Sequence, residues 1–151
     1  MKSPAPPIPV RVLQTHSVPA ATLRVIELPM SAADRRRVRR LVEAPDGVVL
    51  ALELSTGTIL HPGQLLYQDA ESAYVVTAAD EDVLVVRPRD IAEAARIAHL
   101  IGNMHRDIHV QDGDIVALAD DILADRIAKA GAPCERARRP FQGRAPGEHA
   151  H

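Results

Sequence analysis

The sequence predicts an α+β protein with a small antiparallel β domain (residues 1–79), a ferredoxin-like β-α-β-β-α-β domain (residues 80–139) and a flexible tail (residues 140–151). Short β-rich runs separated by turn residues fill the chain as far as Pro88. Helical periodicity then appears twice. From Pro140 onward glycine and proline are frequent, which is typical of a mobile segment.

In the first domain, turn residues separate six short runs that favour strands. The turns are Pro-Asp-Gly at 45–47, Thr-Gly at 56–57, Pro-Gly at 62–63 and Asp-Ala-Glu-Ser at 69–72. Runs of this length and spacing are typical of a small antiparallel β unit. The expected strands are Val10–Thr15, Thr22–Leu28, Val48–Leu54, Thr58–Leu60, Leu65–Gln68 and Tyr74–Ala78.

The second domain opens with an expected strand over Asp82–Arg87, followed by a helix. Asp90 is a good N-cap because its carboxylate accepts a hydrogen bond from a free backbone N–H of the first turn. Gly102-Asn103 is expected to end this helix. Its apolar face is expected to carry Ile91, Ala94, Ala95, Ala98 and Ile101, and its polar face Glu93, Arg96 and His99.

A hairpin and a second helix complete the second domain. Strands over Ile108–Val110 and Ile115–Leu118 flank an Asp112-Gly113 turn, which suits positive φ angles. A helix capped by Asp120 or Asp121 follows, and Ala132–Arg138 can form a last strand. The resulting β-α-β-β-α-β order is that of the split β-α-β motif.

Composition excludes several classes of protein. A net charge of -2, from 18 basic and 20 acidic residues, argues against a general nucleic-acid binder and against attraction to membranes. The single cysteine, Cys134, excludes an intrachain disulfide and is expected to be a small buried hydrophobic residue. No apolar run is long enough to span a membrane, so we expect a soluble, cytoplasmic protein.

Common catalytic signatures are absent from the sequence. It has no Gly-x-x-x-x-Gly-Lys phosphate loop, no Gly-x-Ser-x-Gly turn and no His-Glu-x-x-His pair. We therefore expect a protein that is not an enzyme.

Histidines are the more informative residues, since the chain has 7 of them. His149 and His151 form a His-x-His ending, and imidazole nitrogen is a good ligand for nickel, copper and zinc. His105 follows the expected helix end and is therefore expected to project outward. These three residues are the candidate metal ligands, with His109 and His99 as weaker candidates; a surface position without metal is the alternative for each.

Two other functions are open from the residues alone. The first is a small metal-dependent hydrolase, with His105 and His109 as ligands and Asp107 or Asp112 activating water. The second is an adaptor that binds RNA or an acidic protein through the basic run Arg35–Arg40. That run is otherwise expected to be the solvated face of a strand or loop.

The segment Ala-His-Leu-Ile-Gly-Asn-Met-His at 98–105 resembles the His-Leu-Ile-Gly-Asn-Arg-His signature of the urease accessory protein UreE family, which are nickel metallochaperones. The leucine- and glycine-containing segment at 52–66, the arginine run and the terminal histidine pair are also similar to that family. Met104 stands where the family commonly has arginine. Ala119 and Asp121 stand where some members have further histidines.

The resemblance implies a two-domain protomer, whose N-terminal β domain is similar to a peptide-binding module and whose C-terminal domain binds metal. It also implies a homodimer in which His105 of both subunits binds Ni²⁺ near the two-fold axis. The tail residues His149 and His151 would complete the ligand set, and Zn²⁺ or Cu²⁺ would bind the same ligands in vitro. The implied function is delivery of Ni²⁺ for assembly of the urease active site. The implied partners are the urease accessory GTPase UreG and the urease apoprotein complex, with no nucleic acid and no membrane.

Overall fold

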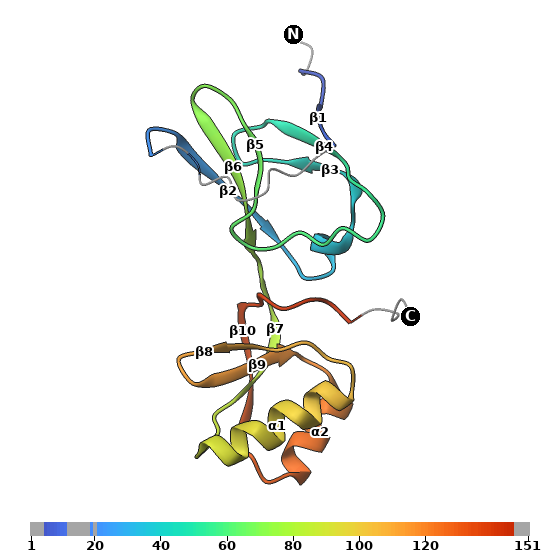
Figure 1. Cartoon of the computed structure of the whole chain (residues 1–151), viewed down its shortest axis with the longest axis vertical. Helices are drawn as coiled ribbons and strands as arrows, with labels where there is room; N and C mark the ends of the chain where they lie inside the picture. Colours follow the sequence, from blue (N-terminus) through green and yellow to red (C-terminus); the bar gives the residue numbers. More distant parts are fainter. Residues whose placement is uncertain (1–4, 12–18, 20, 147–151) are drawn as a thin grey trace. The chain divides into compact units, whose positions relative to one another are not determined.

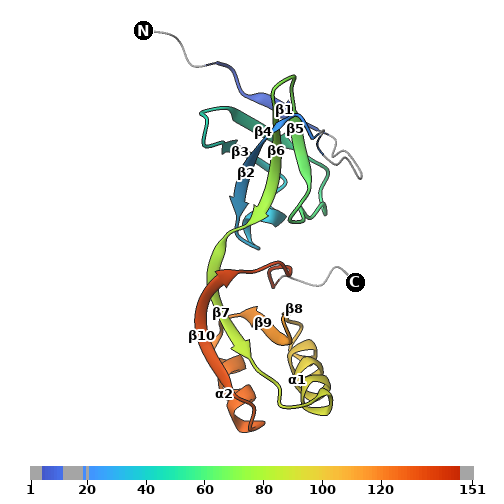
Figure 2. The same ribbon diagram turned by 90° about the vertical axis from the view of Figure 1, so that its left-hand side faces the viewer.

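The computed structural model describes residues 5–11, 19 and 21–146, which form two compact units (Figures 1 and 2). The first unit comprises the described residues up to Met30 together with Asp34–Thr77. The second comprises Ser31–Ala33 and the described chain from Ala78 onward.

The first unit is built from two three-stranded sheets. One has the order β1-β4-β3 and the other the order β2-β6-β5. β3 pairs antiparallel with β4, and β1 pairs parallel with β4. The strands are β1 (Ile8–Val10), β2 (Arg24–Met30), β3 (Arg39–Glu43), β4 (Val49–Glu53), β5 (Leu65–Gln68) and β6 (Ser72–Ala78).

Several features of the first unit differ from the sequence prediction. Of the predicted strand Val10–Thr15, Val10 ends β1, Arg11 is not in a strand, and residues 12–15 lie outside the described residues. The run Thr58–Leu60 is not a strand, because the Thr58 N–H closes a turn onto the carbonyl of Ser55. The strand β3 lies in the arginine-rich segment and was not among the expected strands. The pair β1–β4 is parallel, an arrangement that needs a long connection between its two strands.

Alternating apolar residues of these strands form the core of the first unit. In β2 every second residue is buried, from Ile26 to Met30, as a half-buried strand requires. Leu50 and Leu52 of β4 face the same core. Arg35, in a 3-10 turn at Asp34–Arg36, is only 1% exposed, so the prediction of a solvated arginine run is wrong at this position.

The second unit is a four-stranded antiparallel sheet with two helices on one face (Figure 2). Its strand order is β10-β7-β9-β8, and its element order is the predicted β-α-β-β-α-β. Asp112 and Gly113 both have positive φ, 53° and 86°, as predicted for the hairpin turn. The elements are β7 (Asp80–Val86), α1 (Ile91–Asn103), β8 (His109–Gln111), β9 (Asp114–Leu118), α2 (Asp121–Lys129) and β10 (Cys134–Pro140).

Aspartate caps start both helices, as the sequence predicts. The Asp90 carboxylate accepts from the Glu93 N–H at 2.7 Å, and the Asp120 carboxylate accepts from the Leu123 N–H at 2.9 Å. The predicted faces of α1 are partly wrong, because Ile91 is 86% exposed whereas Glu93 is buried. Ala95, also assigned to the apolar face, is exposed, and Ile97, which was not assigned to it, is 2% exposed and lies in the core. Cys134, expected to be buried, is exposed.

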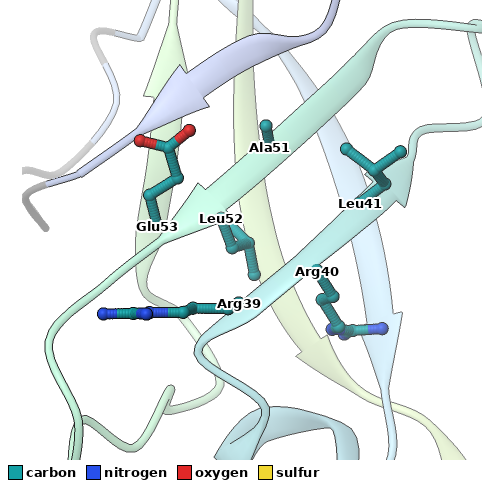
Figure 3. A pocket seen from close by; sticks show the side chains of 6 residues that line it. All are labelled: Arg39, Arg40, Leu41, Ala51, Leu52 and Glu53. Atoms are coloured by element: carbon teal, nitrogen blue, oxygen red, sulfur yellow. The ribbon is translucent and has the colours of Figure 1, made fainter.

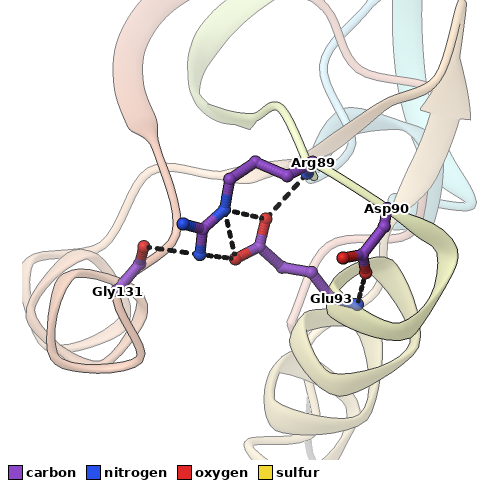
Figure 4. Close-up of polar contacts among 4 residues, drawn as sticks. All are labelled: Arg89, Asp90, Glu93 and Gly131. Carbon is purple, nitrogen blue, oxygen red and sulfur yellow. Dashed lines mark hydrogen bonds and ion pairs between the residues drawn. The ribbon is translucent and has the colours of Figure 1, made fainter.

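The buried carboxylate of Glu93 is held by Arg89 (Figure 4). The Arg89 side chain forms an ion pair with it, and the Arg89 N–H donates to Glu93 Oε2 at 2.7 Å. Arg89 also donates to the carbonyl of Gly131 at 3.5 Å, which connects the start of α1 to the turn after α2. These hydrogen bonds, first those of the guanidinium, lower the pKa of Glu93 to about 2.

The Glu93→Gln variant is expected to be less stable than the parent at neutral pH. The unfolded carboxyl titrates near pH 4.5, so stability from the ionised group is complete above that pH and falls as pH decreases towards 2. The difference between parent and variant should therefore narrow between about pH 4.5 and 2. Urea unfolding at pH 7, 4 and 3 measures it. Asp82→Asn, at an exposed ion pair with Arg138, is the control and should change stability little. A constant difference across these pH values would contradict this.

Candidate metal centre

His105 lies at the end of α1, in a backbone conformation that residues other than glycine rarely adopt. Its φ is 55°, in the left-handed region. The His105 N–H donates to the carbonyl of Gly102 at 2.9 Å, and the Arg106 N–H donates to the carbonyl of Ile101 at 3.3 Å. This pair of bonds is the Schellman helix end, in which His105 occupies the position that glycine usually takes. Its side chain is exposed.

The helix ends later than the sequence predicts. Gly102 and Asn103 are still helical, and Met104 is the C-cap. His105 is exposed at the helix end, as the sequence predicts. The left-handed residue that ends the helix is His105 itself, and not the glycine at position 102. A left-handed residue with a side chain costs about 1 kcal/mol relative to glycine. Such strain at an exposed histidine is a reason to look for a function at this position.

Two ion pairs fix the loop that carries His105. Arg106 donates to Asp120, the cap residue of α2, at 2.9 Å. Asp107 accepts from the backbone N–H of Arg144 at 2.7 Å and from its Nε at 3.3 Å. The backbone on the C-terminal side of His105 is thus held to α2 and to the chain beyond β10.

The weaker candidates, His99 and His109, already have other interactions. His99 Nε2 accepts from the amide of Asn103 at 2.9 Å. His109 Nδ1 accepts from the N–H of Gln142 at 3.3 Å, and its ring lies 5.4 Å from that of Phe141. Burial lowers the pKa of His109, which therefore stays neutral more readily than an ordinary histidine.

The predicted ligands are not assembled within one described chain. Within residues 5–11, 19 and 21–146, no three His, Cys, Asp or Glu side chains gather where they could hold a metal ion. His149 and His151 lie outside the described residues. The structure shows one of the predicted ligands, His105, exposed at a helix end whose following loop is held by ion pairs.

The arginine run in the first unit is partly neutralised. Arg37 and Arg40 both approach Asp34, at 3.7 and 3.5 Å, and burial lowers the pKa of Arg40. A hollow of about 510 Å³ lies over β3 and β4 (Figure 3). Glu53, which lines this hollow, forms an ion pair with Arg11, with 2.7 Å between Glu53 Oε2 and Arg11 Nε. The run is therefore a mixed surface with a buried part. The hollow is lined by Arg39, Arg40, Leu41, Ala51, Leu52 and Glu53.

Sequence reasoning missed the contacts of residues 141–145, which it assigned to the flexible tail. Phe141 is fully buried, and Arg144 is bonded to Asp107. An aromatic residue is rare in this chain, where aromatics make up 2%. Its presence in a stretch rich in glycine and proline was the available signal that this stretch packs against the fold.

Comparison with known proteins places both halves of the chain in one family. Residues 10–79 match the family model described as the UreE urease accessory protein N-terminal domain, and residues 81–151 match the C-terminal domain. A urease accessory protein UreE from Deinococcus radiodurans is 47% identical over 124 residues, 82% of this chain and 80% of the relative. One from Synechococcus is 44% identical over 129 residues, 85% of this chain and 87% of the relative.

These matches define an accessory protein of urease. More particularly, the chain belongs to the UreE family. This confirms the family resemblance found in the sequence. In the part of the chain that the structure describes, neither helix is long and apolar enough to cross a membrane.

Proposed function

We propose that this protein binds Ni²⁺ and delivers it for assembly of the urease active site. His105 of two chains anchors the ion at the axis of a homodimer, and His149 and His151 complete its coordination. The observation that carries the proposal is the exposed His105 in a strained left-handed conformation, in a chain of the UreE urease accessory family.

A homodimer explains how one histidine can form a site. A two-fold contact presents the same residue from both subunits, so one exposed imidazole per chain becomes two. The ion pair of Arg106 with Asp120 holds the His105 loop against α2, and a pre-organised loop loses little entropy when it binds metal.

The ligand chemistry suits a carrier. Imidazole nitrogen binds Ni²⁺, and a set without thiolate leaves the ion exchangeable. Zn²⁺ and Cu²⁺ bind the same type of ligand, so selectivity has to come from the partner or from metal supply. For coordination by His99 or His109, each would have to give up the hydrogen bond it now accepts.

The protein acts without catalysing a reaction, in the cytoplasm, and hands the ion to the accessory GTPase UreG and the urease apoprotein complex. A hydrolase is less well supported. One of its proposed groups, Asp107, is bound by Arg144, and His109 packs against Phe141. The adaptor is also less well supported, because Arg35 is buried and Asp34 offsets its neighbours.

Equilibrium dialysis against Ni²⁺, together with native mass spectrometry, tests the proposal. We expect one tightly bound ion per two chains, and weaker binding by a chain that ends at Gly147. A nickel-loaded monomer would overturn the proposal. Tight binding that persists after removal of both tail histidines would remove them from the ligand set.

A further inference from the structure

Residues 141–145, which we call the strap, follow β10 and pack on the sheet of the second unit. The helices cover one face of this sheet through Leu84, Val86, Ile115 and Ala117. The alternate strand residues point to the other face and form a second cluster of buried side chains. Phe141 belongs to this cluster and Ala145 packs against it, so the strap covers the face without helices. The buried members are Ala32, Val83, Val85, Val116 and Phe141.

The far end of the strap is fixed beside the His105 loop. The N–H and the Nε of Arg144 both donate to Asp107 Oδ2, at 2.7 and 3.3 Å. The N–H of Gln142 donates to His109 Nδ1 at 3.3 Å. Gly143 lies on the Phe141 ring so closely that a β-carbon there would be 2.5 Å from a ring atom.

The strap therefore carries the chain from one edge of the sheet to the other. β10 and β8 are the two edge strands, with β7 and β9 between them. Neighbouring strands lie about 4.8 Å apart, so these edges are separated by about 14 Å. Asp107 lies just before β8, two residues after His105. Figure 1 shows the red segment after β10 running towards the end of α1.

We propose that the strap is a positioning device that starts the histidine tail next to His105 of the same chain. The inference rests on the proposed nickel function. From Arg144, His149 is reached by five residues, 145–149, which span at most about 17 Å. Without the strap, the free chain starts at the β10 edge and needs nine residues, 141–149, to reach the same ligand position.

Loss of the strap should lower the effective concentration of the tail histidines. Effective concentration falls with about the −3/2 power of linker length and falls further with the distance to be spanned. Together these effects predict about fivefold weaker Ni²⁺ binding for a Phe141→Ala/Asp107→Ala variant and about twofold for Asp107→Ala alone. The single variant keeps Phe141 and so serves where the double variant fails to fold.

Isothermal titration with Ni²⁺ in full-length chains and in chains ending at Pro146 tests this inference. In the full-length chain, both variants should weaken binding. In the shortened chain, which has no tail histidines, Asp107→Ala should have no effect. An equal effect in both backgrounds would mean that Asp107 acts on His105 directly and would overturn the proposal. Asp82→Ala removes a matched exposed carboxylate paired with Arg138 and should leave affinity unchanged.

A metal-free measurement separates the strap from the nickel proposal. A nitroxide attached at Ala150→Cys, in a Cys134→Ser background, should broaden the amide resonances of residues 105–108, and the double variant should reduce this broadening. If the broadening depends on the strap but no tight nickel site exists, the proposed role of the strap is supported and the nickel function is refuted. Broadening that the variant does not change would refute the strap.

Discussion

Replacing His105 with glycine is expected to abolish tight nickel binding without destabilising the protein. The residue has a φ of 55°, which glycine adopts without a steric penalty. The variant therefore loses the imidazole while the helix end gains about 1 kcal/mol of relief from strain. In the proposed homodimer, this substitution removes two ligands from the metal. Since loss of an outer-shell partner alone costs 10–100-fold in affinity, we expect at least about 100-fold weaker binding.

Equilibrium dialysis and thermal unfolding of the same samples measure both effects. His105→Ala should lose nickel equally but be about 1 kcal/mol less stable than His105→Gly, because alanine keeps the β-carbon that the left-handed region disfavours. His61→Ala removes an exposed histidine of the first unit and is the matched control, with unchanged affinity. Tight nickel binding by His105→Gly would remove His105 from the site.

Local chemistry made the second unit predictable. Asp90 and Asp120 cap their helices through hydrogen bonds to residues three positions away, so the information lies within one turn of sequence. The Asp112-Gly113 turn is equally local, since its two positive φ angles follow from its residue types. Helices and hairpins specified in this way give the β-α-β-β-α-β order directly.

Features that depend on tertiary packing were not predictable. Glu93 reads as a polar helix position, yet Arg89 neutralises it and it is buried. Arg35 reads as part of a solvated run, yet its turn directs it into the first unit. Periodicity assigns charged residues to the surface by default, so a charged residue whose burial depends on a partner or a backbone turn is assigned wrongly.

The candidate site also has features that local sequence predicts and features that it does not. An exposed His105 at a helix end could be predicted, because Gly102-Asn103 indicates a helix end nearby. Its left-handed backbone could not, since the sequence offers Gly102 as the more obvious helix-ending residue. The contact between Asp107 and Arg144 joins residues 37 positions apart, and no local pattern specifies it.

Nickel release is expected between about pH 6.5 and 5. An imidazole binds metal through the lone pair that a proton would otherwise occupy, and an ordinary imidazole has a pKa near 6.5. Below that value, affinity falls about tenfold per pH unit for each histidine ligand, so a site with two such ligands loses about 100-fold per unit. Protonation favours the metal-free chain, and affinity therefore decreases as pH decreases.

Titrations with Ni²⁺ at pH 7.5, 6.5 and 5.5 measure this dependence. Circular dichroism at pH 5.5 separates release from unfolding. The low pKa of Glu93 places the loss of its stabilisation below about pH 4.5, so this group does not unfold the chain in the release window. Glu93→Gln should then release nickel over the same interval as the parent. An affinity that stays constant from pH 7.5 to 5.5 in a folded chain would refute ligation by histidine, because carboxylate ligands titrate well below this range.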